Sequence, residues 1–276
     1  MATKGNLIVR LFIIVAALLT GGDAWCYTVV IDAGHGGKDV GAKGETAVEK
    51  DINLAVALKL GKLITKEHKD VKVIYTRSTD VFVPLQKRCD IANKAKGDLF
   101  ISIHTNSVDA SNPNRKTVEG ASVYTLGLSR QKENLDVAKR ENSVMTLEKD
   151  YTTTYCGFDP NSSESYIMFE MSQNRHINQS VRFARLAQRQ LVKGAGRADK
   201  GVRQDIFWVL VQTGMPAVLV ELDFICNPRH EEFMSTTEGQ DKLAKALAKA
   251  FTDYHAQLPG EPKAPSSTKK RNKNKK

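Results

Sequence analysis

Two histidines stand where a folded sheet would present them to a ligand. His35 follows the β-branched, apolar run Tyr27–Ile31, and His104 follows the run Asp98–Ile103. The carboxyl ends of neighbouring parallel strands meet at one edge of an open α/β sheet, so the two imidazoles are expected to converge there. Imidazole is a common ligand of transition metals. One such histidine is more often structural, but two at equivalent strand ends favour a metal site.

Two glutamates can complete this site. A catalytic zinc needs three protein ligands and an open position for water, and Glu49 is a candidate third ligand. The alternative is a capping box, in which the Glu49 carboxylate reaches back to the Thr46 amide at the start of a helix; the spacing leaves both open. Glu221 closes the apolar run Pro216–Val220. Its carboxylate is expected to be partly buried, either in a salt bridge or as a general base beside a metal-activated water.

The elements that must position these residues alternate along the chain. Apolar residues at helical spacing predict helices over about 49–66, 85–94, 177–194 and 243–254. Alternating strands and helices with short links indicate an α/β fold, here a single domain with a largely parallel central sheet of about six strands flanked by helices. Runs of β-branched and apolar residues predict the strands at 27–31, 71–75, 98–103, 121–124, 206–210 and 217–220.

The two ends of the chain differ from the body in composition. Lys4 and Arg10 precede a short apolar run at 11–19, which is too short for a hydrocarbon core of roughly 30 Å. Residues 1–26 are therefore expected to be a secretory signal peptide, with an uncleaved anchor or a buried strand as the alternatives. Residues 259–276 are rich in Pro, Ser, Lys and Asn and predict a disordered basic tail. The domain between them is expected to span 27–258.

Charge and glycine patterns exclude two classes of partner. The net charge is +10, but residues 263–276 alone hold seven basic residues and no acid. The nearly neutral body argues against nucleic-acid binding, which needs basic residues gathered on one folded face. The segment Asp32–Gly37 is glycine-rich, but Asp39 breaks the dinucleotide motif and Ala42 breaks the phosphate-loop motif. The four cysteines contain no C-x-x-C pair. An exported protein could pair them in three ways, which stay open, but small buried apolar residues are the favoured interpretation.

Several motifs in order carry a resemblance to a known family. The chain resembles the zinc-dependent N-acetylmuramoyl-L-alanine amidases of bacterial cell walls over about Val29–Tyr254. It departs from the family pattern at Val40, where proline is usual, and at Asp223, where glycine is usual. The matching segments are Val30–Asp39, Glu49–Asp51, Thr76-Arg77 with Asp80, Leu85 and Arg88, Ser102–Ser107, Gly201–Gln204, and Pro216–Glu221 with Phe224 and Asn227-Pro228.

The resemblance implies an activity and a set of site residues. His35, Glu49 and His104 match the family's zinc ligands, and Glu221 matches its catalytic glutamate. The family cleaves the amide between the lactyl group of N-acetylmuramic acid and the L-alanine of the stem peptide. Asp32 and Asn106 are candidates for orienting the ligands, although ordinary turn and cap roles suit them equally.

The same resemblance gives expectations for regulation, partners and cellular location. Residues 129–165 are the least periodic part of the body and are a candidate lid insertion; some relatives block the zinc with a segment near here, and Glu148 or Glu164 could supply the carboxylate. A plain surface insertion is the alternative. Peptidoglycan is the expected partner, in the periplasm or cell envelope. An activator protein and the oligomeric state stay open. The rival functions are a zinc peptidase or carboxypeptidase on stem peptides and a non-catalytic cell-wall-binding regulator.

Overall fold

A computed structural model describes residues 27–127, 131–170 and 176–258. The expected leader 1–26 and basic tail 259–276 lie outside these residues. No helix of the described part is long and apolar enough to cross a bilayer. Among the described cysteines, Cys89 and Cys226 are buried as expected, whereas Cys156 is exposed; none of the three is in a disulfide.

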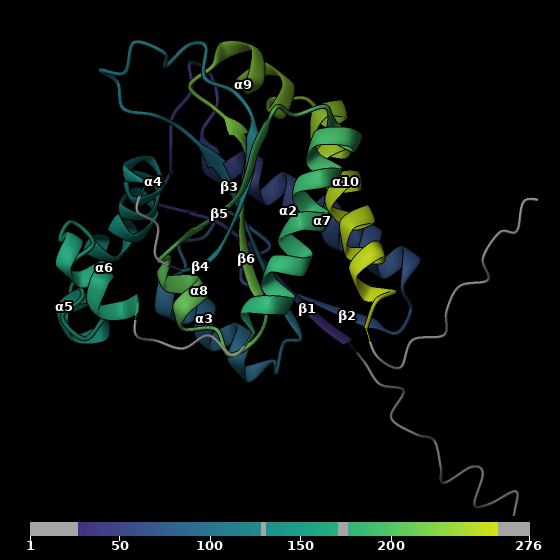
Figure 1. Ribbon diagram of the computed structural model, residues 1–276, viewed down its shortest axis with the longest axis horizontal. Coiled ribbons are helices and arrows are strands. Elements are labelled where there is room, and N and C mark those ends of the chain that lie inside the picture. The colour runs from purple at the N-terminus through teal and green to yellow at the C-terminus, as the bar shows by residue number, and fades with distance from the viewer. Residues whose placement is uncertain (1–26, 128–130, 171–175, 259–276) are drawn as a thin grey trace, which may run out of the picture.

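The central sheet has six strands in the order β2-β1-β3-β6-β4-β5 (Figure 1). The pairs β1–β2, β1–β3, β3–β6 and β4–β5 are parallel, and β4–β6 is antiparallel. The predicted α/β fold with a largely parallel sheet is thus confirmed. The strands are β1 (Tyr27–Ala33), β2 (Val71–Tyr75), β3 (Leu99–Asn106), β4 (Ala121–Leu126), β5 (Asp199–Asp205) and β6 (Ala217–Phe224).

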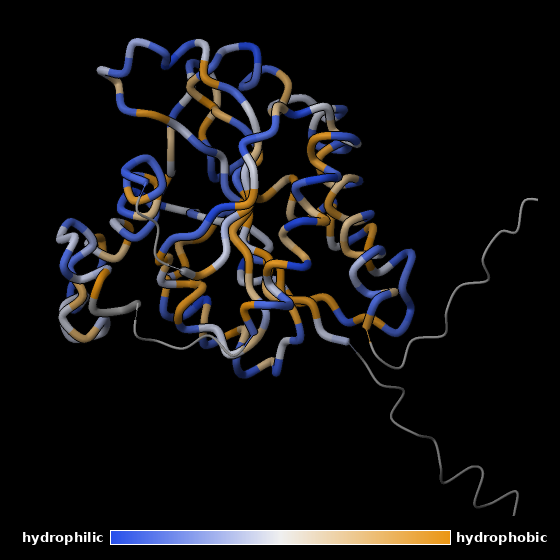
Figure 2. The backbone as a smooth tube through the Cα atoms, in the orientation of Figure 1, coloured by the Kyte–Doolittle hydropathy of each residue, from blue (hydrophilic) through white to orange (hydrophobic). Residues whose placement is uncertain are grey.

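Two hydrophobic cores lie on opposite faces of the sheet. Helices α2 (Glu49–Glu67), α7 (Ile177–Ala195) and α10 (Thr237–His255) pack against one face. The other face is covered by α3 (Leu85–Lys94), α8 (Trp208–Val211) and the segment after β4. Figure 2 shows apolar residues along the central strands, with hydrophilic residues in the peripheral loops. A short helix, α9 (Pro228–Ser235), links β6 to α10.

One predicted strand is wrong. The apolar run 206–210 is a short loop followed by α8, and the fifth strand is the polar segment β5 just before it. β5 lies at the edge of the sheet, where most of its residues are only half-buried, so it needs no apolar run. The run 206–210 is instead fully buried in the second core, which explains its hydrophobicity without a strand.

The segment 131–170 forms a helical cluster at one side of the sheet (Figure 1). Its elements are α4 (Lys132–Asn142), the 3-10 helix η1 (Ser143–Leu147), α5 (Tyr151–Thr154) and α6 (Ser163–Glu170). The described part of the expected insertion 129–165 therefore consists mainly of short helices. They are anchored by Tyr155, Phe158 and Tyr166, whose rings lie in the second core.

Candidate active site

The two histidines meet at the carboxyl edge of the sheet, as predicted. His104 lies on β3 and His35 lies in the turn after β1, and their ring centroids are 5.0 Å apart. His104 packs directly on Gly34: a Cβ there would come within 2.4 Å of the His104 Nε2 and Cε1 atoms. Only glycine permits this approach, which leaves the opposite nitrogen, Nδ1, facing the site.

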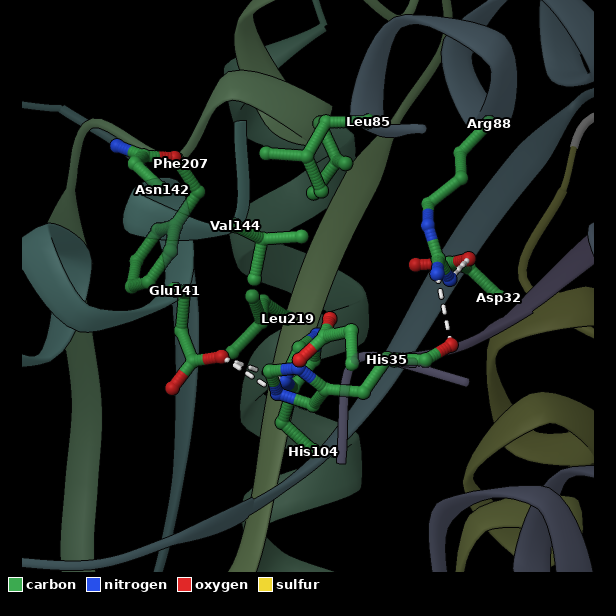
Figure 3. A pocket seen from close by; sticks show the side chains of 13 residues that line it. Asp32, His35, Leu85, Arg88, His104, Glu141, Asn142, Val144, Phe207 and Leu219 are labelled. Atoms are coloured by element: carbon green, nitrogen blue, oxygen red, sulfur yellow. Dashed lines mark hydrogen bonds and ion pairs between the residues drawn. The ribbon is translucent and has the colours of Figure 1, made fainter. Parts of the chain in front are cut away.

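A buried arginine fixes the turn that carries His35. The backbone of His35 is in the left-handed region, with φ of 62°, which is unusual for a residue other than glycine. Arg88 is 1% exposed; its guanidinium donates to the His35 carbonyl at 2.8 Å and to the Ala33 carbonyl at 2.7 Å (Figure 3). The same group pairs with Asp32 at 2.7 Å. This interaction positions His35 through its main chain.

Asp32 therefore acts on the turn and not on the imidazoles. Its carboxylate accepts hydrogen bonds from Thr76, Arg88 and Ser102 and makes none with a histidine of the site. Burial by itself would raise the Asp32 pKa, but the Arg88 charge and the hydroxyl donors lower it overall. The residue that does orient an imidazole is Asp39, whose Oδ2 lies 2.8 Å from His35 Nδ1. That contact leaves His35 Nε2 for a ligand.

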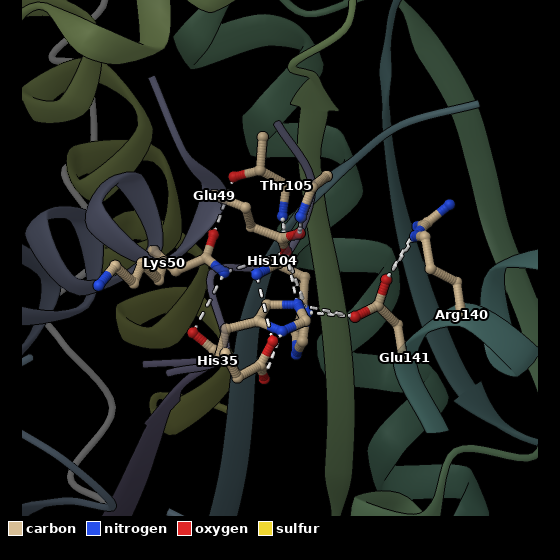
Figure 4. Close-up of polar contacts among 12 residues, drawn as sticks. His35, Glu49, Lys50, His104, Thr105, Arg140 and Glu141 are labelled. Atoms are coloured by element: carbon tan, nitrogen blue, oxygen red, sulfur yellow. Dashed lines mark hydrogen bonds and ion pairs between the residues drawn. The ribbon is translucent and has the colours of Figure 1, made fainter. Parts of the chain in front are cut away.

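Four donor atoms converge on one point. His35 Nε2 lies 3.2 Å from Glu49 Oε1 and 3.0 Å from Glu141 Oε2, and His104 Nδ1 lies 3.1 Å and 2.9 Å from the same two oxygens (Figure 4). All four residues are buried. Donors about 2.0–2.1 Å from a small tetrahedral ion such as zinc lie about 3.3 Å from one another. The observed spacings are close to that value, so the cluster fits a metal ion.

Glu49 is oriented toward the cluster and is not a helix cap. Its Oε1 accepts from the Asn53 side chain at 3.1 Å and the Thr105 amide at 2.9 Å, and its Oε2 accepts from the Ala42 amide at 2.8 Å. The capping box is absent, because the Thr46 amide donates to Glu231 and the residue before α2 makes no side-chain cap. Hydrogen bonds of this kind orient carboxylates around metals.

The pKa values describe how the cluster is charged without a metal. Burial lowers the pKa of His104, but the charge of Glu141 outweighs it and raises the pKa to about 9. The His35 pKa is also raised, because the Glu49 charge outweighs burial. The pKa of Glu141 is lowered well below its usual range, since the His104 and Arg140 charges outweigh burial. Because metals bind neutral imidazole, metal binding releases these protons.

Glu221 lies beside the cluster with its carboxylate unsatisfied. It pairs in register with His104 across β3–β6, which places both side chains on one face of the sheet. It is 0% exposed, and neither oxygen makes a hydrogen bond with a described residue. The nearest cation is Arg140, with Nη2 3.7 Å from Oε1. Burial and the Glu141 charge raise the Glu221 pKa to about 8, which suits a group that takes and returns a proton.

Glu141 is the member of the cluster that the sequence analysis missed. The two carboxylates considered there lie elsewhere: Glu148 accepts from the Tyr155 hydroxyl, and Glu164 is exposed and bonded to Ser162. Glu141 lies near the end of helix α4 and not at the end of a strand. The pattern that identified the other site residues therefore does not apply to it. Its neighbour Arg140 donates to the Asn106 side chain at 3.1 Å. Asn106 thus holds the α4 segment and contacts no donor atom of the cluster.

The two departures from the family pattern leave the cluster untouched. The Asp223 backbone is not left-handed, so the position needs no glycine conformation. Its buried carboxylate accepts from the Gly120 and Phe224 amides and from Arg197, and it contacts His230 at 2.8 Å. The Val40 carbonyl accepts from the amide of Lys50. Asp223 therefore links β6 to distant segments, and Val40 takes part in the turn before α2.

Two imidazoles and two carboxylates are buried together at the edge of an α/β sheet and could hold a metal ion, as such groups do in metal-dependent hydrolases. Residues 29–253 match the family model described as N-acetylmuramoyl-L-alanine amidase. The chain belongs to this family of hydrolases.

Individual relatives agree with that assignment. The chain is 32% identical to the N-acetylmuramoyl-L-alanine amidase AmiC of Escherichia coli O6:H1 over 83% of its own length and 52% of the relative's. It is also 32% identical to AmiA of Escherichia coli K12, over 82% and 75% of the two lengths. It thus spans about half of AmiC and three quarters of AmiA.

Solved structures agree as well. The amidase from Clostridium difficile 630 matches with a TM-score of 0.63 at 26% identity, over 84% of this chain and 98% of that one. The catalytic domain of CwlV from Bacillus (Paenibacillus) polymyxa matches with a TM-score of 0.60 at 28% identity, over 83% and 98%.

Proposed function

We propose that this chain hydrolyses the amide between the lactyl group of N-acetylmuramic acid and the L-alanine of the peptidoglycan stem peptide, using a zinc ion held by His35, Glu49 and His104. The observation that carries the proposal is the convergence of three donor atoms from β1, α2 and β3 at tetrahedral spacing, each oriented by the fold around it. Two neutral imidazoles and one carboxylate leave zinc a net positive charge and an open position.

Zinc in such a site polarises a carbonyl and makes a water more acidic. Glu221 would take the proton of the attacking water and deliver it to the leaving amine of L-alanine. Its position supports this role, because its carboxylate has no hydrogen-bond partner among the described residues to hold it in a purely structural contact. The Arg88–Asp32 pair keeps the His35 turn in place, and Asp39 fixes the tautomer of its ring.

The test of this reaction is digestion of purified peptidoglycan by the zinc-loaded chain, followed by mass spectrometry. Amidase activity releases intact stem peptides and leaves free lactyl termini on the glycan. A zinc peptidase or carboxypeptidase would shorten the peptides and leave them attached, and a cell-wall-binding regulator would release nothing. Either of these last two results would contradict the proposal.

Glu141 is proposed to block the zinc. It comes from the segment expected to be a lid, and its Oε2 occupies the fourth corner of the cluster, where a substrate or water would bind. α4 is further held by Arg140, which donates to the Ser107 carbonyl at 2.7 Å and to Asn106. In this arrangement the segment must move before the substrate can enter.

Replacing Glu141 with alanine is expected to raise activity on a soluble muropeptide by about fivefold. A carboxylate that favours the closed state by about 1.4 kcal/mol limits the open fraction to roughly one tenth, and its loss raises that fraction to about one half. Initial rates of peptide release measure the effect. Glu148→Ala is the matched control, because Glu148 lies in the same segment and binds Tyr155 instead. If Glu141→Ala is no faster than the unmodified chain, the segment is a plain insertion.

We propose that the protein acts outside the cytoplasm. Similar proteins include one described as a probable cell wall amidase, LytH of Staphylococcus epidermidis, at 31% identity over 82% of this chain. Together with the expected leader, this supports export to the periplasm or cell envelope, where peptidoglycan lies. A blocked site also suits an activator protein that displaces the α4 segment, and we propose such a partner without naming it.

A further inference from the structure

A groove of about 790 Å³ lies along the sheet, and Asn106 and Arg140, which are close in sequence to His104 and Glu141 of the metal cluster, are among its lining residues. One wall is α4, and the other is the loop that follows β3. Its floor is formed by β4 and β5, through Ser122, Tyr124, Lys200 and Arg203. These floor residues belong to no part of the reaction described above.

Strand register places the floor residues next to the catalytic glutamate. Ser122 pairs with Glu221 across β4–β6, and Tyr124 pairs with Arg203 across β4–β5. Directly paired residues of neighbouring strands point to the same face of a sheet. Ser122, two residues before Tyr124, shares that face. Ser122 and Tyr124 therefore lie between Glu221 and Arg203 on one face of the sheet, and these four side chains form a polar path.

Tyr124 brings an unsatisfied polar group to this path. The residue is 0% exposed, and its hydroxyl makes no hydrogen bond with a described residue. Its ring is fixed by an edge contact with Phe207 at 5.1 Å between centroids. The hydroxyl lies next to the Arg203 and Ser122 side chains, where it can donate to a carboxylate that Arg203 binds; phenylalanine would pack against Phe207 but could not donate.

The closed α4 segment contacts both ends of the path. Glu141 lies at the metal cluster, while Asn134 Oδ1 accepts from Arg203 Nη1 at 2.8 Å and Glu133 Oε2 lies 4.0 Å from the same atom. Glu133 and Glu141 are eight residues apart on one helix, which corresponds to about 12 Å. One helix thus places a carboxylate beside the metal cluster and a second beside Arg203.

We propose that Arg203, assisted by the Tyr124 hydroxyl, binds a free carboxylate of the stem peptide about 12 Å from the scissile amide, and that Glu133 and Asn134 occupy this subsite in the closed state. At up to about 3.6 Å per residue, three residues span about 11 Å, so that distance is reached at the carboxyl group of the third residue and not at the second. The subsite rests on the proposed amidase reaction, because it names which substrates that reaction prefers.

The test is a competition in one mixture among three soluble muramyl tripeptides: one with free carboxylates, one amidated at the second residue and one amidated at the third. Replacing Arg203 also removes its hydrogen bond to Asn134 and could change the fraction of enzyme in which α4 is displaced from the site. This fraction affects the cleavage rates of all three substrates equally, so it does not change their ratio. The unmodified chain is expected to prefer the free form over the analogue amidated at the third residue by about 10-fold or more, the value typical of a hydrogen bond to a charged group. The disfavoured analogue identifies the carboxylate.

Single substitutions test whether the carboxylate preference depends on the residues of the groove floor. Arg203→Gln is expected to abolish it, and Tyr124→Phe to reduce it by about 2- to 10-fold. Arg185→Gln, on the exposed side of α7, is the matched control and should retain it. Equal cleavage of all three tripeptides by the unmodified chain, or full preference in Arg203→Gln, would overturn the subsite.

A binding measurement separates this proposal from the reaction. The free stem tripeptide cannot be cleaved at the lactyl amide, and its affinity can be compared with that of the two amidated tripeptides by calorimetry. If the chain cleaves none of the muropeptides, the proposed reaction fails, and a carboxylate preference that depends on Arg203 in this assay still supports the subsite. No such preference in binding overturns it.

Discussion

Replacing Glu221 with glutamine is expected to lower turnover of a soluble muropeptide by roughly 10²- to 10⁴-fold, which is the usual contribution of general acid–base catalysis. Glutamine keeps the size and polarity of the side chain but cannot accept and return the proton. Zinc content and fold should persist, because Glu221 supplies no donor atom to the cluster. Steady-state rates, metal analysis and thermal unfolding of the same samples measure the three properties.

The competing role for Glu221 is a salt bridge with Arg140, whose Nη2 lies 3.7 Å away. That role predicts altered stability with little kinetic change. Glu231→Gln is the matched control: Glu231 is a buried carboxylate that accepts hydrogen bonds from the backbone amides of residues 45–47, and its replacement should reduce stability more than turnover. If Glu221→Gln holds zinc and hydrolyses at nearly the unmodified rate, another carboxylate must act as the base.

Loss of either imidazole is expected to remove the metal. The unmodified chain should bind about one zinc ion, and His35→Ala or His104→Ala should lose it together with activity, because each deletes one of three framework ligands. Metal analysis after dialysis measures the stoichiometry. His68→Ala is the control, since His68 bonds to Thr252 away from the cluster and should leave the zinc in place.

Glu49→Ala separates the ligand from a purely structural role. As a ligand, Glu49 is needed for tight zinc binding. If the variant instead keeps full zinc content and activity and loses only stability, because the hydrogen bonds from the Ala42 and Thr105 amides are gone, the ligand assignment is wrong. The same result would also remove the basis for placing the fourth coordination position at Glu141 Oε2.

Much of the site follows from local sequence. β1, β3 and β6 are buried on both faces, so their apolar runs stand out, and the polar residues that end them must lie at one edge of a parallel sheet. That argument places His35, His104 and Glu221 at one edge of the sheet from the sequence alone. The helix carrying Glu49 was equally visible, because its buried residues Ile52, Val56 and Leu60 recur at helical spacing.

Other features depend on contacts between distant segments. β5 was misplaced because an edge strand needs no apolar run, whereas the buried run 206–210 next to it did not need to be a strand. The capping-box alternative for Glu49 was settled by Glu231, 185 residues from Thr46, which takes the amide that the box would use. Asp39, and not Asp32, orients His35, because the buried Arg88 pairs with Asp32.

By itself, the sequence determined the ends of β1, β3 and β6 and the position of the α2 helix, since periodicity and burial are local properties of the chain. These elements made His35, His104 and Glu221 candidates for one site, whereas the role of Glu49 stayed open between a ligand and a helix cap. Only the tertiary structure decided which carboxylate closes the fourth corner. Glu141 lies on a helix whose approach to the metal cluster depends on Arg140 reaching Ser107 and Asn106, and on aromatic anchors in the second core. Such packing joins residues far apart in the chain, and no local pattern of residue types encodes it.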